Sequence, residues 1–209
     1  MKKKKIILFL LIVFIVTGIV AGAIYFYVKA HPKAKPEEKK EAVILNSIGD
    51  YGITLSDLDS ELYKSEYEIL KKNLESDNID YEEYAKSISK MFIIDLYTLS
   101  TKLNKFDVGG YEFVYPPVVE NYKVNVEDTL YKYLEDNSTG KRYQVLPKVT
   151  SIKVDSIKTA KYEIKSENKT YEGYKVNLSW KYEKELGYDD EANLIIIRVD
   201  NKLYVAEKN

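Results

Sequence analysis

Tyr174–Tyr182 reads YKVNLSWKY, an alternation of apolar and polar side chains over nine residues. A period of two places the two kinds of side chain on opposite faces of a β-strand. The stretch therefore predicts an antiparallel strand that packs one face against a core and exposes the other face to water.

Three further strands are predicted around it, at Ile152–Ile164, Leu194–Val199 and Leu203–Ala206. The alternation slips near Asp155–Ser156, which indicates a bulge in the first of these strands. Ser166–Thr170 closes a hairpin between that strand and YKVNLSWKY, and Asp200–Lys202 supplies the last turn. Leu194–Val199 is almost wholly apolar, so we expect it near the centre of the sheet.

Upstream of these strands the apolar residues recur at helical intervals, which predicts helices. The first helix begins at the capping-box pair Ser56 and Asp59 and ends at Ser76–Asn78. Asp80 caps the second helix, which stops before Asp107–Gly110, where paired glycines permit positive φ. The stripe of the second helix comprises Tyr84, Ile88, Met91, Phe92, Asp95, Leu96, Leu99 and Leu103.

A short extended piece is expected at Tyr111–Tyr115, and Pro117 suits the first turn of a third helix. The third stripe comprises Val118, Tyr122, Val126, Thr129, Leu130, Tyr133 and Leu134. Helices followed by an antiparallel meander predict an α+β domain, with three helices packed on a curved antiparallel sheet of about four strands.

The run Ile6–Val28 contains no charged residue and, as a helix, would span roughly 34 Å, enough to cross a bilayer. Tyr25 and Tyr27 sit where an interfacial aromatic belt is expected. The alternative is a signal peptide cleaved after Ala21–Ala23, but the apolar run continues beyond that site. We therefore predict an uncleaved signal anchor with one transmembrane helix. Gly18 and Gly22 form a Gly-x-x-x-Gly pair, a possible helix-dimer face.

The chain then divides into a cytoplasmic tail at residues 1–5, the anchor at 6–28, a linker at 29–41 and an extracytoplasmic domain at 42–209. The lysines flanking the anchor are nearly balanced in number. Translocation of a short tail with four consecutive lysines is the less favourable event, so the N-terminus is placed in the cytoplasm. The predicted location is the cell membrane, with the domain outside.

Composition favours a bacterial cell-envelope protein. The chain holds 20 tyrosines and 32 basic residues, of which Arg142 and Arg198 are the two arginines. This bias towards lysine and tyrosine is typical of the AT-rich genome of a low-GC, Gram-positive bacterium. With no cysteine, the exported domain must be stabilised by its core and not by disulfides.

The charge of the outer domain argues against nucleic-acid binding. Nine of the 32 basic and three of the 33 acidic residues precede Ala42, which leaves 23 against 30, a net charge of about −7. A sequence-independent grip on phosphates needs the opposite sign. The predicted partners are the lipid bilayer and envelope proteins, or a second copy of the chain.

Catalysis through histidine or cysteine is excluded for the domain, because the single histidine, His31, lies in the linker. The carboxylate clusters at Asp57–Glu61, Asp77–Glu83 and Tyr188–Glu191 are interpreted as solvated or capping groups, with a cation site as the alternative. Neither of the first two has the glycine and spacing of a calcium loop, and Tyr188–Glu191 is a turn with three acidic residues. The sequence predicts neither a metal nor an organic cofactor.

Asp95 is the one weak candidate for catalysis, because it lies on the apolar stripe of the second helix. Burying a carboxylate is unfavourable unless it is hydrogen-bonded or paired. The structural interpretation is that it accepts N–H bonds from the Asp107–Gly110 loop. The functional alternative is an aspartate base with tyrosines nearby, as in ketosteroid isomerase.

The tyrosines are expected to divide between core and surface. Tyr84, Tyr122 and Tyr133 fall on apolar stripes and are assigned to the core. Four others are assigned to the surface, where tyrosine serves interfaces well: Tyr63, Tyr67, Tyr171 and Tyr188.

The chain resembles the layout of a nuclear transport factor 2-like cone on a single-pass anchor. The segments that carry the likeness are Ile6–Val28, Tyr81–Leu134, and the strands Tyr174–Tyr182 and Leu194–Ala206. The chain is similar in layout to the bitopic assembly factors of type IV secretion and conjugation machines. The resemblance is architectural, and no functional residue is carried over. It implies a short cytoplasmic tail, one membrane helix and an outer cone that makes protein contacts.

These observations together predict a membrane-anchored extracytoplasmic scaffold without catalysis. The alternatives are a cone that binds or senses a small ligand, and an acid–base enzyme centred on Asp95.

Overall fold

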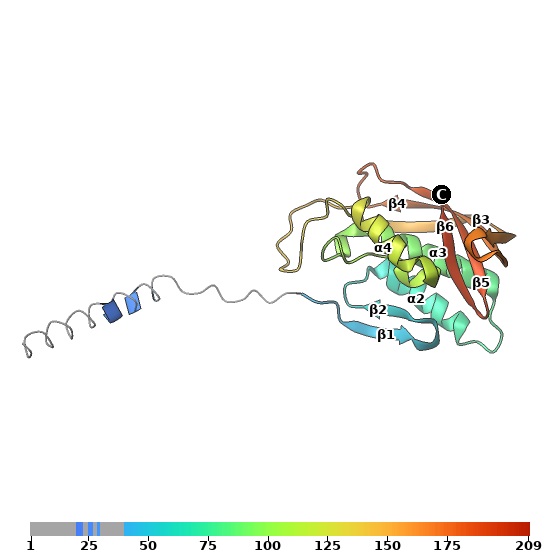
Figure 1. The fold of residues 1–209 in the computed structure, drawn as a ribbon, viewed down its shortest axis with the longest axis horizontal. Helices are drawn as coiled ribbons and strands as arrows, with labels where there is room; N and C mark the ends of the chain where they lie inside the picture. The colour runs from blue at the N-terminus through green and yellow to red at the C-terminus, as the bar shows by residue number, and fades with distance from the viewer. Residues whose placement is uncertain (1–19, 23–24, 27–28, 30–39) are drawn as a thin grey trace, which may run out of the picture. The chain divides into compact units, whose positions relative to one another are not determined.

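The computed structural model describes residues 20–22, 25, 26, 29 and 40–209 (Figure 1). The chain divides into two compact units, residues 1–38 and 39–209. The second unit is an α+β domain, and the fold class predicted from sequence is therefore confirmed for this part of the chain.

The described residues of the first unit are helical and include Gly22 and Tyr25. The rest of the predicted anchor Ile6–Val28, with Gly18 and Tyr27, lies outside the described residues, as do the tail and most of the linker. Among the residues that the structure describes, no helix is both long enough and apolar enough to cross a bilayer.

The domain is built on a four-stranded antiparallel sheet in which neighbours in sequence are neighbours in space. Its strands are β3 (Val149–Ile164), β4 (Lys169–Tyr182), β5 (Glu191–Val199) and β6 (Lys202–Lys208). The YKVNLSWKY stretch lies in β4, and its apolar face is buried. The register of β3 shifts between Val154 and Ser156, which confirms the predicted bulge. β5 is an inner strand, as predicted.

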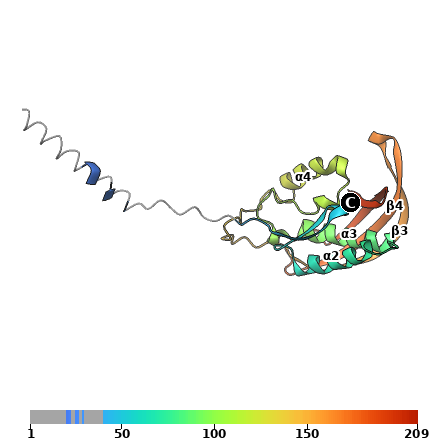
Figure 2. The same ribbon diagram turned by 90° about the horizontal axis from the view of Figure 1, so that it is seen from below.

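Three helices accompany the sheet: α2 (Glu61–Leu74), α3 (Tyr81–Tyr97) and α4 (Val119–Asp128). α3 packs against α2 and across the strands of the sheet, and the main core lies between them (Figures 1 and 2). Asp80 caps α3, as predicted. The expected start of the first helix was wrong, because Ser56 ends a strand and Ser60 is the cap of α2.

The sequence interpretation missed a hairpin that precedes the helices. β1 (Ile44–Ile48) pairs with β2 (Ile53–Ser56) through a 3-10 turn at Gly49–Tyr51 and a left-handed Gly52. Ile48 is buried against the main core, together with Ile53 and Leu55. The strands are too short for their alternation to stand out from the adjoining helix.

The stretch from Leu99 to Leu134 differs most from prediction. Three 3-10 turns interrupt it, at Leu99–Thr101, Tyr111–Phe113 and Pro116–Val118. The expected extended piece at Tyr111–Tyr115 is therefore wrong for Tyr111–Phe113, whereas Val114 is extended. α4 ends at Asp128, because Thr129 leaves the helical conformation and its hydroxyl donates to the Asn125 carbonyl. Beyond that point Tyr133, which was predicted to lie in the core, is 79% exposed, whereas Leu134 is buried and Leu130 packs against the core.

The assignment of tyrosines to the surface was also largely wrong. Tyr63 and Tyr67 are buried in α2, because they share a helical face with Leu70 and Leu74. Tyr171 is also buried, while Tyr188 and Tyr122 are half-buried and Tyr84 is in the core as expected.

A small second core covers the other face of the sheet. It is centred on Tyr115, Tyr171 and Ile197. Val114 forms a parallel bridge to Val205 of β6, and the Tyr115 N–H donates to the Val205 carbonyl at 3.0 Å. The β3–β4 hairpin extends past β5 and turns up beside α4 (Figure 2). Its turn is a short 3-10 segment at Lys165–Glu167.

Gly173 allows the close approach of β4 and β5, since a Cβ there would lie 1.9 Å from the Ile196 carbonyl oxygen. We expect Gly173→Ala to lower the free energy of unfolding by about 1–3 kcal/mol or more, because the strands must separate. Gly49→Ala is the control, since a Cβ at Gly49 meets nothing within 4 Å. Urea denaturation measures both, and equal losses would refute the explanation.

Candidate functional site

Asp95 lies near the C-terminal end of α3, and its side chain is 19% exposed, whereas its neighbours Ile94 and Leu96 are buried. The helix therefore holds the carboxylate at the edge of the core. There it faces the loop that follows α3 and the first turns of the domain.

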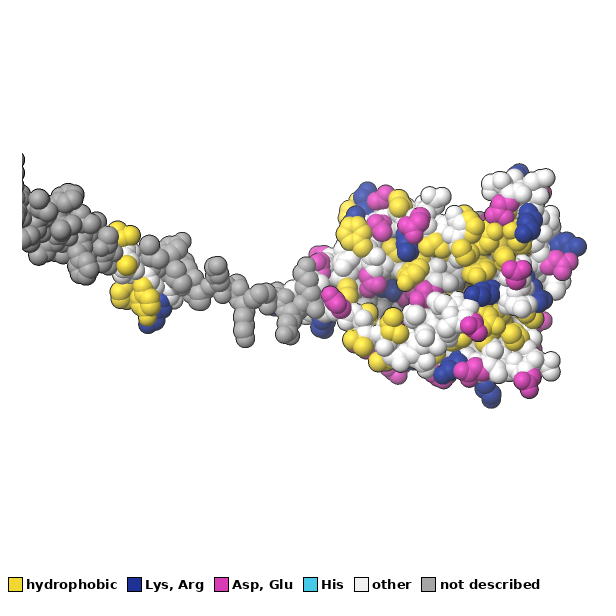
Figure 3. All heavy atoms as spheres, turned by 60° about the horizontal axis from the view of Figure 1, so that its bottom comes forward, with side chains coloured by type: hydrophobic (Ala, Val, Ile, Leu, Met, Phe, Trp, Pro, Cys, Tyr) yellow, Lys and Arg dark blue, Asp and Glu magenta, His cyan; other side chains and the backbone are white. Residues whose placement is uncertain are grey.

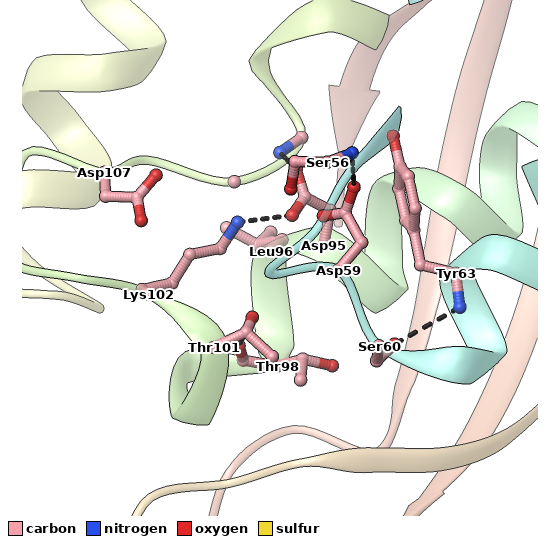
Figure 4. A network of polar contacts seen from close by, with 12 residues as sticks. Ser56, Asp59, Ser60, Tyr63, Asp95, Leu96, Thr98, Thr101, Lys102 and Asp107 are labelled. Atoms are coloured by element: carbon pink, nitrogen blue, oxygen red, sulfur yellow. Dashed lines mark hydrogen bonds and ion pairs between the residues drawn. The ribbon is translucent and has the colours of Figure 1, made fainter. Parts of the chain in front are cut away.

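Both oxygens of Asp95 have partners in the structure (Figure 4). The Gly110 N–H donates to Oδ2 at 2.6 Å, and the Lys102 ammonium pairs with Oδ1. Gly110 has the predicted positive φ, at +77°. The structural interpretation, that Asp95 accepts an N–H bond from the Asp107–Gly110 loop, is confirmed.

The loop passes very close to α3. A Cβ on Gly109 would lie 2.1 Å from the Asp95 carbonyl oxygen, so this position requires glycine. Two tyrosine hydroxyls stabilise this close contact between the loop and α3. Tyr131 donates to the Leu96 carbonyl at 2.8 Å, and Tyr122 donates to the Gly109 carbonyl at 2.7 Å.

Three more carboxylates line a cleft of about 260 Å³ together with Asp95 and Lys102. They are Asp59, Asp107 and Glu112. Each accepts a main-chain N–H, at 2.6, 2.8 and 3.0 Å, from Ser56, Leu103 and Thr54 respectively. The cluster therefore joins β2 and the start of α2 to the end of α3 and the loop behind it.

The cleft is strongly acidic, with four carboxylates around one ammonium group. Burial raises the pKa of Asp59 and of Glu112, and the negative charge of Asp95 adds to both shifts. Burial also disfavours the charged form of Lys102, but the carboxylates of Asp95 and Asp107 outweigh it and raise the pKa of Lys102. The lysine therefore stays cationic and stabilises the cluster.

This geometry supports a structural role for Asp95. A general base needs an oxygen within reach of a substrate proton, and here donors from the protein engage both oxygens. Two tyrosines line the cleft, and burial raises the pKa of Tyr63 and of Tyr111, so both stay protonated. The Tyr63 hydroxyl itself donates to the Thr54 carbonyl, at 3.4 Å.

The other acidic clusters serve as caps and local anchors. Asp57 accepts the Val43 N–H at 2.8 Å, Asp80 caps α3, and Asp189 accepts the Tyr97 hydroxyl at 2.9 Å. Within the described part of the chain, no group of three or more His, Cys, Asp or Glu residues is arranged to hold a metal ion. His31 lies outside that part.

Sequence reasoning missed two members of the cluster. Lys102 lies seven residues after Asp95 but beyond the end of α3 and the 3-10 turn that follows it, so no helical spacing links the two residues. Glu112 bonds Thr54 from 58 residues away, and no local pattern connects the two.

A second candidate site is a groove of about 710 Å³ between the β3–β4 hairpin and the start of α4. Tyr115, Tyr162, Ile164 and Ala206 give it an apolar floor. The hairpin turn at Lys165–Glu167 forms one rim, and Pro117, Val118 and Asn121 form the other.

Hydrogen bonds between tyrosine hydroxyls and carboxylates connect the segments that line this groove. The hydroxyls of Tyr115 and Tyr171 lie 3.0 Å apart, and both donate to the Glu167 carboxylate. The bond with Tyr171, followed by burial, raises the pKa of Tyr115. The hydroxyl of Tyr162 donates to Glu207 of β6 at 2.6 Å. The hairpin is thus joined to β6 through Tyr162 and to the segment before α4 through Glu167.

No protein-family model, no curated protein and no solved structure matches this chain. The function must therefore be argued from the two sites themselves.

We expect Lys102→Met to lower the free energy of unfolding by about 3–5 kcal/mol, because it leaves the Asp95 charge buried without its partner. Adding Asp95→Asn should recover part of the loss. Lys64→Met breaks an exposed pair with Glu61 and should change stability far less. Urea denaturation that gives similar losses for the two lysine variants would contradict this account.

The raised pKa of Asp59 predicts a pH-dependent effect for Asp59→Asn, which keeps an acceptor for the Ser56 N–H. A carboxyl whose pKa is raised by folding stabilises the fold while protonated, and that contribution is lost as pH rises through the raised pKa. Thermal denaturation at pH 3 and pH 7 should show the variant gaining on the wild type at the higher pH. Asp57→Asn, at an exposed carboxylate, gives the baseline. An equal difference at both pH values would refute the prediction.

Proposed function

We propose that this chain is a single-pass membrane protein whose outer domain binds a protein partner in an envelope complex. Ile6–Val28 crosses the bilayer in this proposal, with residues 1–5 in the cytoplasm and residues 42–209 outside. The charge-free apolar run and its leading lysines support the anchor. The architectural likeness to bitopic assembly factors of secretion machines supports an outer domain that makes protein contacts.

The groove beside the β3–β4 hairpin is the observation that carries the proposal. It lies at the end of the domain opposite Lys40, where the described domain begins (Figures 1 and 2). Its tyrosine-rich floor is typical of protein interfaces, where aromatic anchors contribute much of the binding energy. The Asp95 cleft has about a third of this volume and is filled with charges already engaged by the protein.

The chemistry of the groove points to an extended, apolar and basic segment of the partner. Val114 and Tyr115 already add to β6 as a short parallel strand, and Pro116 ends this pairing because it has no N–H. A partner strand laid beyond that point would cover the apolar floor. The groove is lined by Glu163 and Glu167 against one lysine, Lys165, and the domain is net negative, which together favour basic side chains on that segment.

The test is site-specific photo-crosslinking in native membranes with the full-length chain. A photoreactive phenylalanine analogue replaces Tyr162 in the groove or, as the matched control, Lys161 on the opposite face of the same strand. We expect a discrete cross-linked envelope protein from position 162 and none from position 161.

Two results would contradict the proposal. One is the same set of products from both positions, which indicates random collision. The other is the absence of any product from position 162 while the chain is present in the membrane fraction.

A further inference from the structure

The end of the domain where Lys40 begins is built from three segments that are distant in sequence. The Lys40 N–H donates to the Ser138 carbonyl at 2.6 Å, and the Asn137 N–H donates to the Leu103 carbonyl at 2.6 Å. The start of β1, the loop after α3 and the long loop before β3 therefore meet around the point where the chain enters the domain.

Large apolar side chains are exposed at this end. We call them the tether-end surface: Val43, Ile44, Leu45, Phe106, Tyr133 and Tyr143. Their exposed fractions run from 58% at Val43 to 95% at Tyr143. Figure 3 shows hydrophobic side chains at this end of the domain, interspersed with acidic and basic ones. Such residues scattered singly need no explanation, but a group around one point does.

The exposed rings are held outward by an ordered frame. The Arg142 guanidinium donates to the carbonyls of Lys102 and Ser100, at 2.8 and 3.0 Å. The Gln144 amide accepts the Glu135 N–H and donates to the Tyr133 carbonyl, each at 2.9 Å. The backbone on both sides of Tyr143 is therefore fixed, and the ring has no place in the core.

A lysine ammonium group lies beside two of the exposed rings. The Lys105 ammonium lies 4.9 Å from the centre of the Phe106 ring, and the Lys132 ammonium lies 5.4 Å from the centre of the Tyr133 ring. An exposed ring with a cation beside it suits the boundary between lipid headgroups and acyl chains. There the apolar body can be buried while the charge stays near phosphate.

Chain length limits how far this end can lie from a bilayer. Residues 29–39 separate the apolar run Ile6–Val28 from Lys40. Eleven residues at about 3.3–3.6 Å each reach at most about 40 Å, and less when the linker is not fully extended. If the run crosses the membrane, as proposed above, Lys40 lies within about 40 Å of that membrane, so the tether-end surface is within reach of it.

We propose that the tether-end surface rests on the outer leaflet of the membrane that anchors the chain. Tyr133, Tyr143 and Phe106 enter the headgroup region, and Val43–Leu45 lie against it. This contact gives the domain one orientation and directs the groove beside the β3–β4 hairpin away from the bilayer. The inference depends on the anchor in the proposed function, but not on the identity of the protein partner.

The chain contains no cysteine, so a single introduced cysteine places one fluorescent reporter. Thr139→Cys places the dye in the exposed loop beside the tether-end surface. Ser166→Cys places it at the far end of the domain, in the hairpin turn. The full-length chain, labelled with an environment-sensitive dye, is reconstituted in vesicles of phosphatidylcholine and phosphatidylglycerol. Lipids with a quencher near the headgroup report proximity.

We expect several-fold stronger quenching at position 139 than at position 166. Tyr133→Ser combined with Tyr143→Ser should abolish the difference, and both positions are exposed, so the fold should survive. Equal quenching at the two sites, or quenching unaffected by the double substitution, would overturn the inference.

Flotation of the vesicles separates this failure from failure of the anchor. A chain that does not float with the vesicles contradicts the proposed function itself. A chain that floats while position 139 stays unquenched contradicts only the lipid contact.

Discussion

The buried pair of Asp95 and Lys102 holds together the half of the domain nearest Lys40. Asp95 stands at the end of α3, Lys102 follows the next turn, and the Gly110 N–H completes the coordination of the carboxylate. Without the ammonium group, four carboxylates would share one cleft of about 260 Å³. Like charges at that density repel strongly where water is scarce. The lysine therefore permits the hairpin, the loop and two helices to meet at one point.

Ion pairs and hydrogen bonds between distant segments stabilise both ends of the domain. At one end, Lys102 and main-chain N–H groups engage the carboxylates of the Asp95 cluster. At the other end, the Glu167 carboxylate binds two tyrosine hydroxyls and fixes the hairpin over the second face of the sheet. The sheet between them has apolar residues on both faces, in the manner of an inner layer.

Regular periodicity was sufficient to predict the meander and the existence of three helices. The alternation in Tyr174–Tyr182 and the bulge near Asp155 were visible locally, because a strand with one wet face shows its period directly. The β1–β2 hairpin was missed because its strands hold five and four residues, too few to show a period. Part of the Asp95 site could be predicted from the sequence. The loop that bonds Asp95 was predicted, but the contribution of Glu112 was not. Its bond to Thr54 depends on tertiary contact between distant segments.

β3 has a neighbour on one side only, and it is the longest strand of the sheet, with 16 residues. A bare strand of that length would be a template on which sheets of adjacent molecules could join. The bulge after Val154 breaks the regular spacing of its free N–H and carbonyl groups. The same interruption that shifts the register therefore makes the edge of β3 a poorer template for a strand of another molecule.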